Sequence, residues 1–308
     1  MKRILLASLL LTSAAAQAII YRHDVAEEKH RQLGAQPQFD CVGKVLNAEN
    51  QAAAGSCVLI GDRYVLTAAH LFVKSDIKHD TMMHNGRQMI MHTQTNRRMD
   101  DISHYDFRFN RIRYRGKLMK VLPAYMDSAT NGQCDIALIE LEEPVTNCKP
   151  ATLCTSFDEL RSIATLVGYG VSGNASKPEE VDEYGYKLAG ENTIDTLQGY
   201  QYSDKPALLG FDFDHPEKPQ YNHMGNTKPL AMEGFCGGGD SGGGMLRQRK
   251  DGSWELIGIC SGGGTNIDNL FTIGYYCNTG QYTRVSVFQD WIKQGITDFE
   301  KKRVAESK

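Results

Sequence analysis

Short runs of aliphatic and β-branched residues recur along the chain, separated by residues that favour turns. Cys41–Leu46 and Cys57–Ile60 are two such runs, and the residues between them are rich in Asn, Ala and Gly, which predicts a hairpin with a long loop. Similar runs predict further strands at residues 63–67, 135–141, 166–171, 255–260 and 281–285. This succession of short strands is typical of an all-β barrel or sandwich.

Two segments between these runs have patterns of their own. Residues 105–122 alternate apolar and basic side chains, which predicts one strand with an apolar and a charged face. Basic residues interleaved with aromatic ones can also stack nucleobases. Residues 74–103 are polar and contain several His and Met residues, which could form a soft-metal site. These residues have no fixed spacing, so we favour a surface loop containing a hairpin.

A helical pattern is clear only at the end of the chain. Over residues 286–302, Trp291, Ile292, Ile296 and Phe299 fall on one helical face. A weaker helical pattern covers residues 25–33. The sequence therefore predicts an all-β protein with a C-terminal helix.

Composition and charge describe an ordinary globular protein of 308 residues, with 41% hydrophobic and 23% charged residues. The net charge of −3 favours neither nucleic acid nor an anionic membrane as a partner. Residues 1–18 have a basic start, an apolar run and an Ala-Gln-Ala end, which predicts a cleaved secretory signal peptide. Its removal takes away Lys2 and Arg3 and changes the net charge from −3 to −5. The eight cysteines of an exported chain suggest disulfides.

The segment 234–244 contains seven glycines around Asp240 and Ser241. So many glycines disfavour a helix or a central strand and predict a tight loop. A serine hydroxyl among free backbone N–H groups suits acyl transfer, because those groups can stabilise an oxyanion. A flexible linker is the alternative, but apolar segments flank the loop on both sides.

Two other segments complete a possible catalytic set. His70 ends the segment Thr67-Ala68-Ala69-His70, and Asp135 begins Asp135-Ile136-Ala137-Leu138. With Gly239-Asp240-Ser241-Gly242-Gly243, these segments resemble the three signatures of the chymotrypsin/trypsin family of serine endopeptidases. The resemblance implies a peptidase domain over residues 19–308, built as two packed six-stranded antiparallel β-barrels at about 41–145 and 150–285.

The resemblance also implies catalytic roles. Ser241 would be the nucleophile, His70 the general base and Asp135 the group that orients the imidazole. The N–H groups of Gly239 and Ser241 would form the oxyanion hole, and no metal or other cofactor would be required. A protein or peptide would be the substrate, and a protein protease inhibitor is a further possible partner. The alternatives are an inactive protease-fold binding protein and an esterase with the same triad.

In the family, the carboxylate before the nucleophile pairs with the amino group of a mature N-terminal Ile or Val. Cleavage after Ala18 would expose Ile19. We therefore expect an ion pair between Ile19 and Asp240, formed when the signal peptide is removed.

Specificity and disulfides are also inferred from the resemblance. The specificity pocket would contain Phe235 at its base and the residues Cys236, Ser261, Gly263 and Gly280, which leaves an open pocket for a neutral P1 residue. The family pattern suggests a Cys236–Cys277 disulfide, and the expected hairpin places Cys41 opposite Cys57. A Cys148–Cys154 disulfide would close a small loop, and Cys134 and Cys260 are left unassigned.

Overall fold

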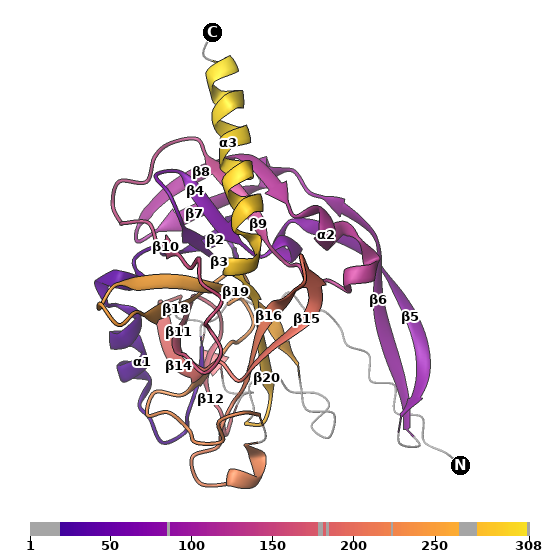
Figure 1. Cartoon of the computed structure of the whole chain (residues 1–308), viewed down its shortest axis with the longest axis vertical. Coiled ribbons are helices and arrows are strands. Elements are labelled where there is room, and N and C mark those ends of the chain that lie inside the picture. The colour runs from indigo at the N-terminus through magenta and orange to yellow at the C-terminus, as the bar shows by residue number, and fades with distance from the viewer. Residues whose placement is uncertain are drawn as a thin grey trace.

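The computed structural model describes residues 19–84, 87–177, 181–182, 185–222, 224–264 and 276–306. The predicted signal peptide, residues 1–18, lies outside the described residues. Two β-sheet units are packed together, with a helix at the end of the chain that runs beside the first unit (Figure 1). The predicted all-β fold with a C-terminal helix is confirmed.

The first unit is a closed antiparallel barrel of six strands, as expected. Going round the barrel, the strands are β2 (Val42–Asn47), β3 (Ala53–Leu59), β4 (Tyr64–Thr67), β9 (Ala137–Leu141), β8 (Ile112–Val121) and β7 (Tyr105–Phe109). Val45, Leu66, Phe107 and Ile139 are fully buried within the unit's apolar core. The predicted hairpin is β2 and β3, which pair with a register shift at Val45/Leu46.

The expectation of one strand over residues 105–122 is wrong, because this segment is a hairpin. Strands β7 and β8 pair with Phe107 opposite Tyr114, and the turn falls at Asn110, whose φ is +53°. Asparagine tolerates this left-handed conformation better than most residues. The alternation of side chains persists on both sides of the turn, so periodicity alone does not reveal it.

The polar segment at residues 74–103 contains the expected hairpin, formed by β5 (Val73–His84) and β6 (Arg87–Met99). It is the long ribbon that projects from the body in Figure 1. The alternative of a soft-metal site in this segment involves His84 and His92, whose side chains lie outside the described residues.

The second unit is an eight-stranded sheet. Its strands run in the order β14 (Leu188–Thr193), β11 (Ile163–Gly168), β18 (Gly244–Gln248), β19 (Trp254–Gly264), β20 (Thr279–Arg284), β16 (Lys205–Asp212) and β15 (Thr196–Tyr202), and β10 (Thr152–Leu153) pairs with β19. Among the described residues this order does not close into the expected ring of six. Leu166, Leu209, Met245 and Ile257 are buried in its core.

A small sheet brings the start of the described chain next to the glycine-rich loop at residues 234–244, which carries Ser241 and is called the nucleophile loop below. Its strands lie in the order β13 (Val181–Asp182), β12 (Ser172–Asn174), β1 (Ile20–Tyr21) and β17 (Gly234–Phe235). Strand β1 is parallel to β12 and antiparallel to β17. Helix α1 (Glu27–Gly34) follows, close to the expected helical segment, and contacts β14 through His30 Nδ1 and the Ala189 carbonyl.

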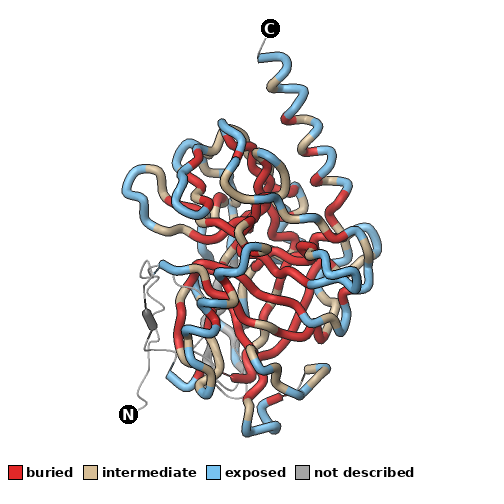
Figure 2. Tube along the Cα trace, turned by 90° about the vertical axis from the view of Figure 1, so that its left-hand side faces the viewer, coloured by how far each residue is buried: buried red, intermediate tan, exposed pale blue. Residues whose placement is uncertain are grey.

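Short helical segments occupy several connections. They are η1 (Pro37–Phe39), η2 (Ala69–Leu71), η3 (Ile102–His104), α2 (Pro123–Met126), η4 (Ser128–Thr130), η5 (Pro219–Tyr221) and η6 (Val285–Phe288). The C-terminal helix α3 (Gln289–Glu306) extends slightly beyond the predicted end. The side chains of Ile292 and Phe299 on its inner face are buried, whereas its last turns are largely exposed (Figure 2). Among the described helices, none is long and apolar enough to cross a membrane.

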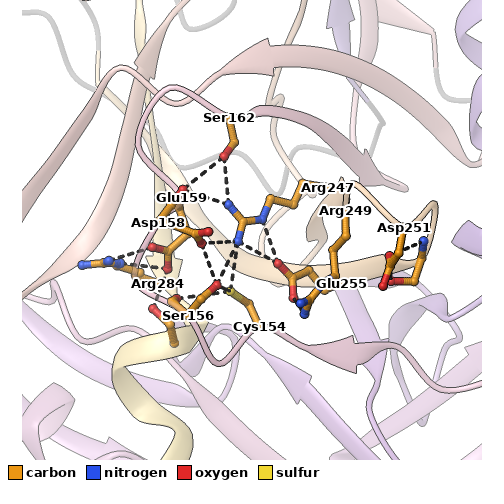
Figure 3. A network of polar contacts seen from close by, with 12 residues as sticks. Cys154, Ser156, Asp158, Glu159, Ser162, Arg247, Arg249, Asp251, Glu255 and Arg284 are labelled. Atoms are coloured by element: carbon orange, nitrogen blue, oxygen red, sulfur yellow. Dashed lines mark hydrogen bonds and ion pairs between the residues drawn. The ribbon is translucent and has the colours of Figure 1, made fainter.

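A buried polar network holds the loop before β11 against the second unit (Figure 3). Glu159 accepts hydrogen bonds from Arg284 Nε at 3.0 Å and Arg284 Nη2 at 2.7 Å. Ser286 Oγ donates to the same carboxylate. Nearby, Arg247 Nε donates to Glu255 across β18 and β19. These buried charges are paired, because burying an unpaired charge away from water costs much free energy.

Candidate active site

His70 reaches the candidate site because strand β4 ends just before it. Tyr64–Thr67 is fully buried in the barrel wall, and the chain then turns into η2, which carries His70. The backbone N–H of His70 donates to Asp135 Oδ1 at 2.9 Å. Asp135 lies just before β9, which is paired with β4, so two adjacent strands bring the two residues together.

The side chains of Asp135, His70 and Ser241 form a continuous chain of contacts. His70 Nδ1 lies 2.6 Å from Asp135 Oδ2, and His70 Nε2 lies 2.8 Å from Ser241 Oγ. Asp135 is 2% exposed, whereas the His70 side chain is 30% exposed. A buried carboxylate, an imidazole at the surface and a hydroxyl therefore stand in the order that nucleophilic catalysis requires.

Further hydrogen bonds hold Asp135 and affect His70. Ser261 Oγ donates to Asp135 Oδ2 at 2.7 Å, and Thr283 Oγ1 donates to the Asp135 carbonyl at 2.9 Å. Ser261, predicted as a pocket residue, thus contacts the Asp135 carboxylate. Burial lowers the pKa of His70, but the charge of Asp135 and its hydrogen bond outweigh burial, so the His70 pKa is raised above 6.5.

Ser56 in β3 holds the nucleophile loop and was not predicted from the sequence. Its N–H donates to the Ser241 carbonyl at 2.8 Å, and its Oγ donates to the Gly239 carbonyl at 3.2 Å. Its Oγ also accepts a hydrogen bond from the Tyr169 N–H at 3.0 Å. A serine inside a buried strand has no sequence signal for such a role, because strand pairing alone explains its position.

The glycines of the nucleophile loop meet two needs. Gly239 and Gly242 have φ values of +83° and +82°, which side chains rarely adopt. A Cβ on Gly242 would overlap Thr67 Oγ1 and the Ser56 carbonyl. The N–H groups of Gly239 and Ser241 donate to no acceptor among the described residues, so both are available to a developing oxyanion.

Asp240, the residue before Ser241, is 1% exposed. Its Oδ2 accepts from the Ile19 backbone nitrogen at 3.0 Å and the Gly237 N–H at 2.8 Å, and its Oδ1 accepts from the Gly170 N–H at 2.9 Å. Gly168 must lack a Cβ, because one would overlap Asp240 Oδ1. Burial raises the pKa of Asp240 to about 7, although the three N–H donors lower it.

The predicted specificity pocket contains aromatic rings where we expected open space. Gly263 and Gly280 face each other on β19 and β20. A Cβ on Gly263 would lie 2.9 Å from Phe235 Cζ, and one on Gly280 would lie 2.6 Å from Phe211 Cε2. The expectation of an open pocket is wrong, because neighbouring rings fill the volume that the glycines leave.

The predicted disulfides are not formed in the structure, where Cys41, Cys57, Cys148, Cys154 and Cys236 are free thiols. The expected opposition of Cys41 and Cys57 is wrong, because Cys57 lies opposite Gly43 and the Cys41 carbonyl accepts from the Leu59 N–H.

Other contacts of these thiols differ from the expected pairs. The Cys236 thiol lies against that of Cys260, while Cys154 contacts Ser156. Burial raises the pKa of Cys41 to about 12 and that of Cys148 to about 11. The Cys41–Cys57, Cys148–Cys154 and Cys236–Cys277 pairings stay predictions for the oxidised protein. Over the described part of the chain, no cluster of three or more His, Cys, Asp or Glu side chains is arranged to hold a metal ion.

Comparison with known proteins identifies the family. A family profile described as Trypsin matches residues 32–292. Mouse complement C1r-A subcomponent is 26% identical over 258 residues, which cover 79% of this chain and 31% of that protein. Phenoloxidase-activating factor 3 of Holotrichia diomphalia is 27% identical over 267 residues, covering 82% of this chain and 66% of that protein. Chymotrypsin-like elastase family member 3B of Macaca mulatta is 33% identical over 97 residues, or 28% of this chain and 33% of that protein.

The chain spans less than a third of the length of the two C1r relatives that it matches. The profile match nevertheless covers most of the chain and includes the segments of His70, Asp135 and Ser241. The closed barrel, the second sheet and the C-terminal helix agree with the fold that this match implies. The chain therefore belongs to the trypsin family of serine proteases.

Proposed function

We propose that this protein is an exported serine endopeptidase that hydrolyses peptide bonds through an acyl-enzyme. The observation that carries the proposal is the hydrogen-bonded sequence from Asp135 through His70 to Ser241, with heavy-atom distances of 2.6 and 2.8 Å. Each residue alone has an ordinary structural explanation, but their alignment at the junction of two sheets gives a nucleophile, a base and an orienting carboxylate.

In the first half of the reaction, Ser241 Oγ attacks the substrate carbonyl carbon while His70 Nε2 takes the hydroxyl proton. The carbonyl oxygen becomes an oxyanion and receives hydrogen bonds from the N–H groups of Gly239 and Ser241. Asp135 holds the imidazole and offsets its positive charge. The C–N bond then breaks, and His70 gives its proton to the leaving amine, which leaves an ester on Ser241.

In the second half, water replaces the amine. His70 takes a proton from the water as its oxygen attacks the ester carbonyl, and the same two N–H groups stabilise the second oxyanion. Collapse of this intermediate breaks the bond to Ser241 Oγ, which recovers its proton from His70. The products are a carboxylic acid and the regenerated hydroxyl, so no cofactor is consumed.

The position of Ile19 supports activation by removal of residues 1–18. The Ile19 nitrogen is already 3.0 Å from Asp240 Oδ2, and both residues are buried. Cleavage after Ala18 would convert this nitrogen into an ammonium group. A cation at that distance would stabilise the Asp240 carboxylate, whose pKa burial otherwise raises. The ion pair would then order the nucleophile loop.

An active-site probe tests the proposal. A fluorophosphonate should label the wild-type protein at Ser241 and fail to label S241A of equal folded content by circular dichroism. Folded wild-type protein that resists the probe would instead indicate an inactive binding protein. Labelled protein that hydrolyses esters but no peptide in a mixed-sequence library would indicate an esterase.

A further inference from the structure

Two glycines of the predicted specificity pocket face aromatic rings of this chain. Gly263 and Gly280 are direct partners on antiparallel strands, and such partners present the same face of a sheet. On that face lie the rings of Phe235 and Phe211, close enough that a Cβ on either glycine would be crowded. The two glycines therefore make room for rings of this chain.

The ring of Phe235 packs against two neighbouring rings. Its centroid lies 6.0 Å from that of Phe211 and 5.8 Å from that of Phe213, and the contact with Phe213 is stacked at 15°. All three side chains are 0% exposed. Protein interiors of this kind are close-packed, so a ring cannot move without displacing its neighbours.

The backbone of Phe235 is held as well. Strand β17, which contains Phe235, pairs with β1, and Phe235 lies opposite the fully buried Ile20. The strand thus fixes the main chain while the two neighbouring rings fix the side chain. Moving the Phe235 ring out of this position would break both the strand pairing and the ring contacts.

This packing lies next to the proposed chemistry. Ser261, which donates to Asp135 Oδ2, is two residues before Gly263 on β19. Phe235 is six residues before Ser241 on the same segment. In the specificity pocket that the family resemblance implies, the side chain that precedes the scissile bond would enter between these two segments and would meet the Phe235 ring.

We infer that Phe235 closes this space and restricts the enzyme to substrates with glycine or alanine before the scissile bond. The inference rests on the proposed function and names its substrate class. A side chain with more carbons would have to displace a buried ring that packs against two other rings, and a misfit of one methylene in an apolar pocket already changes kcat/KM by about 10-fold or more.

The test uses the full chain and its F235A variant with peptides that carry Gly, Ala, Leu, Phe or Arg at this position. Fluorophosphonate titration gives the concentration of active sites and does not depend on which peptide residue precedes the scissile bond. We expect the wild-type kcat/KM for Ala to exceed that for Leu and Phe by about 10-fold or more. F235A should raise kcat/KM for Leu and Phe by about 10- to 200-fold and leave Ala almost unchanged.

F39A is the matched control, because Phe39 is also 0% exposed and packs against Trp254 away from the triad. It should keep the wild-type order of substrates. F235L provides a smaller change that retains more of the packing, and it should shift the order in the same direction.

Titrated wild-type enzyme that cleaves Leu or Phe peptides as fast as Ala peptides would overturn the inference. An F235A variant that titrates but keeps the wild-type order would overturn it too. Neither result affects the proposed function, which fails when the wild-type protein does not react with the probe or hydrolyses no peptide.

Discussion

The Ile19 nitrogen lies 3.0 Å from Asp240 Oδ2, although 221 positions separate the two residues in the chain. Strand β1 makes this approach possible by inserting between β12 and β17. The start of the predicted mature chain and the residue before the nucleophile therefore share one buried site. Whatever changes the charge at Ile19 acts directly on the nucleophile loop.

Protein that starts at Ile19 should be active, and protein with one extra residue before Ile19 should not. The extra residue replaces the ammonium group with an uncharged amide beside a buried carboxylate. We expect kcat/KM to fall about 10²-fold, the loss typical when one oxyanion donor is removed. N-terminal sequencing and peptide hydrolysis on the same sample check this.

The Asp240→Asn variant separates charge from hydrogen bonding, because its amide keeps the shape but cannot pair with an ammonium group. The D240N protein that starts at Ile19 should have a kcat/KM as low as that of the extended protein. Full activity in either protein, or an active wild type that starts elsewhere, would contradict the proposed ion pair.

Asp135 should control both the rate and its pH dependence. Neutral His70 is the base, and the pKa of His70 lies above 6.5, so kcat/KM should fall as the pH drops through a value above 6.5. In D135N, the charge that raises the His70 pKa is lost while burial still lowers it. The imidazole titration should then move below 6.5, and kcat should fall by about 10⁴-fold, as is typical of this triad.

NMR titration of the His70 ring and a pH–rate profile measure these two effects. D106N is the control, because Asp106 is a buried carboxylate, 3% exposed, that hydrogen bonds Gln51. It should leave both the titration and the rate unchanged. A D135N protein whose His70 titrates as in the wild type would show that Asp135 does not set this pKa.

Removing the Ser56 hydroxyl should misplace the nucleophile loop. S56A leaves the buried Tyr169 N–H without its acceptor and frees the Gly239 carbonyl. We expect a loss of about 1–3 kcal/mol in the free energy of unfolding. Because the loop carries Ser241, kcat should also fall about 10-fold, while KM changes little.

The S286A variant removes another buried hydroxyl, which donates to Glu159 instead. It should lower stability without changing kcat, so the pair separates positioning from general stability. Urea unfolding and steady-state kinetics give both quantities. Unchanged kcat in S56A would mean that Ser56 is only a structural residue.

Glu159 should be essential for stability through its contact with Arg284. The two side chains are 0% and 2% exposed, so E159A leaves a buried guanidinium without its carboxylate. We expect the free energy of unfolding to fall by about 3–5 kcal/mol. Urea unfolding measures the change. E306A breaks the more exposed pair with Lys117 and should lower the free energy of unfolding far less; equal losses in both variants would contradict the argument.

Local sequence predicted the features that depend on neighbouring residues. The buried run 64–67 and the segment that begins at Asp135 are strands or strand ends because their side chains are apolar and β-branched. The approach of His70 to Asp135 was expected only from the family resemblance, because local sequence does not say which strands pair. The helix at the end of the chain followed from its apolar face. The hairpin of β7 and β8 was missed because side-chain alternation is the same on both sides of its turn.

The sequence alone determined the all-β class and the terminal helix, because periodicity and residue type are local properties, and it supplied the candidate catalytic residues through the segments that resemble the trypsin family. Only the tertiary structure decided that Ser56 holds the Ser241 loop and that Phe235 packs against Phe211 and Phe213 beside Gly263. A glycine in the sequence marks missing volume, but the folded chain decides what fills that volume. Here strands distant in sequence place an aromatic ring there.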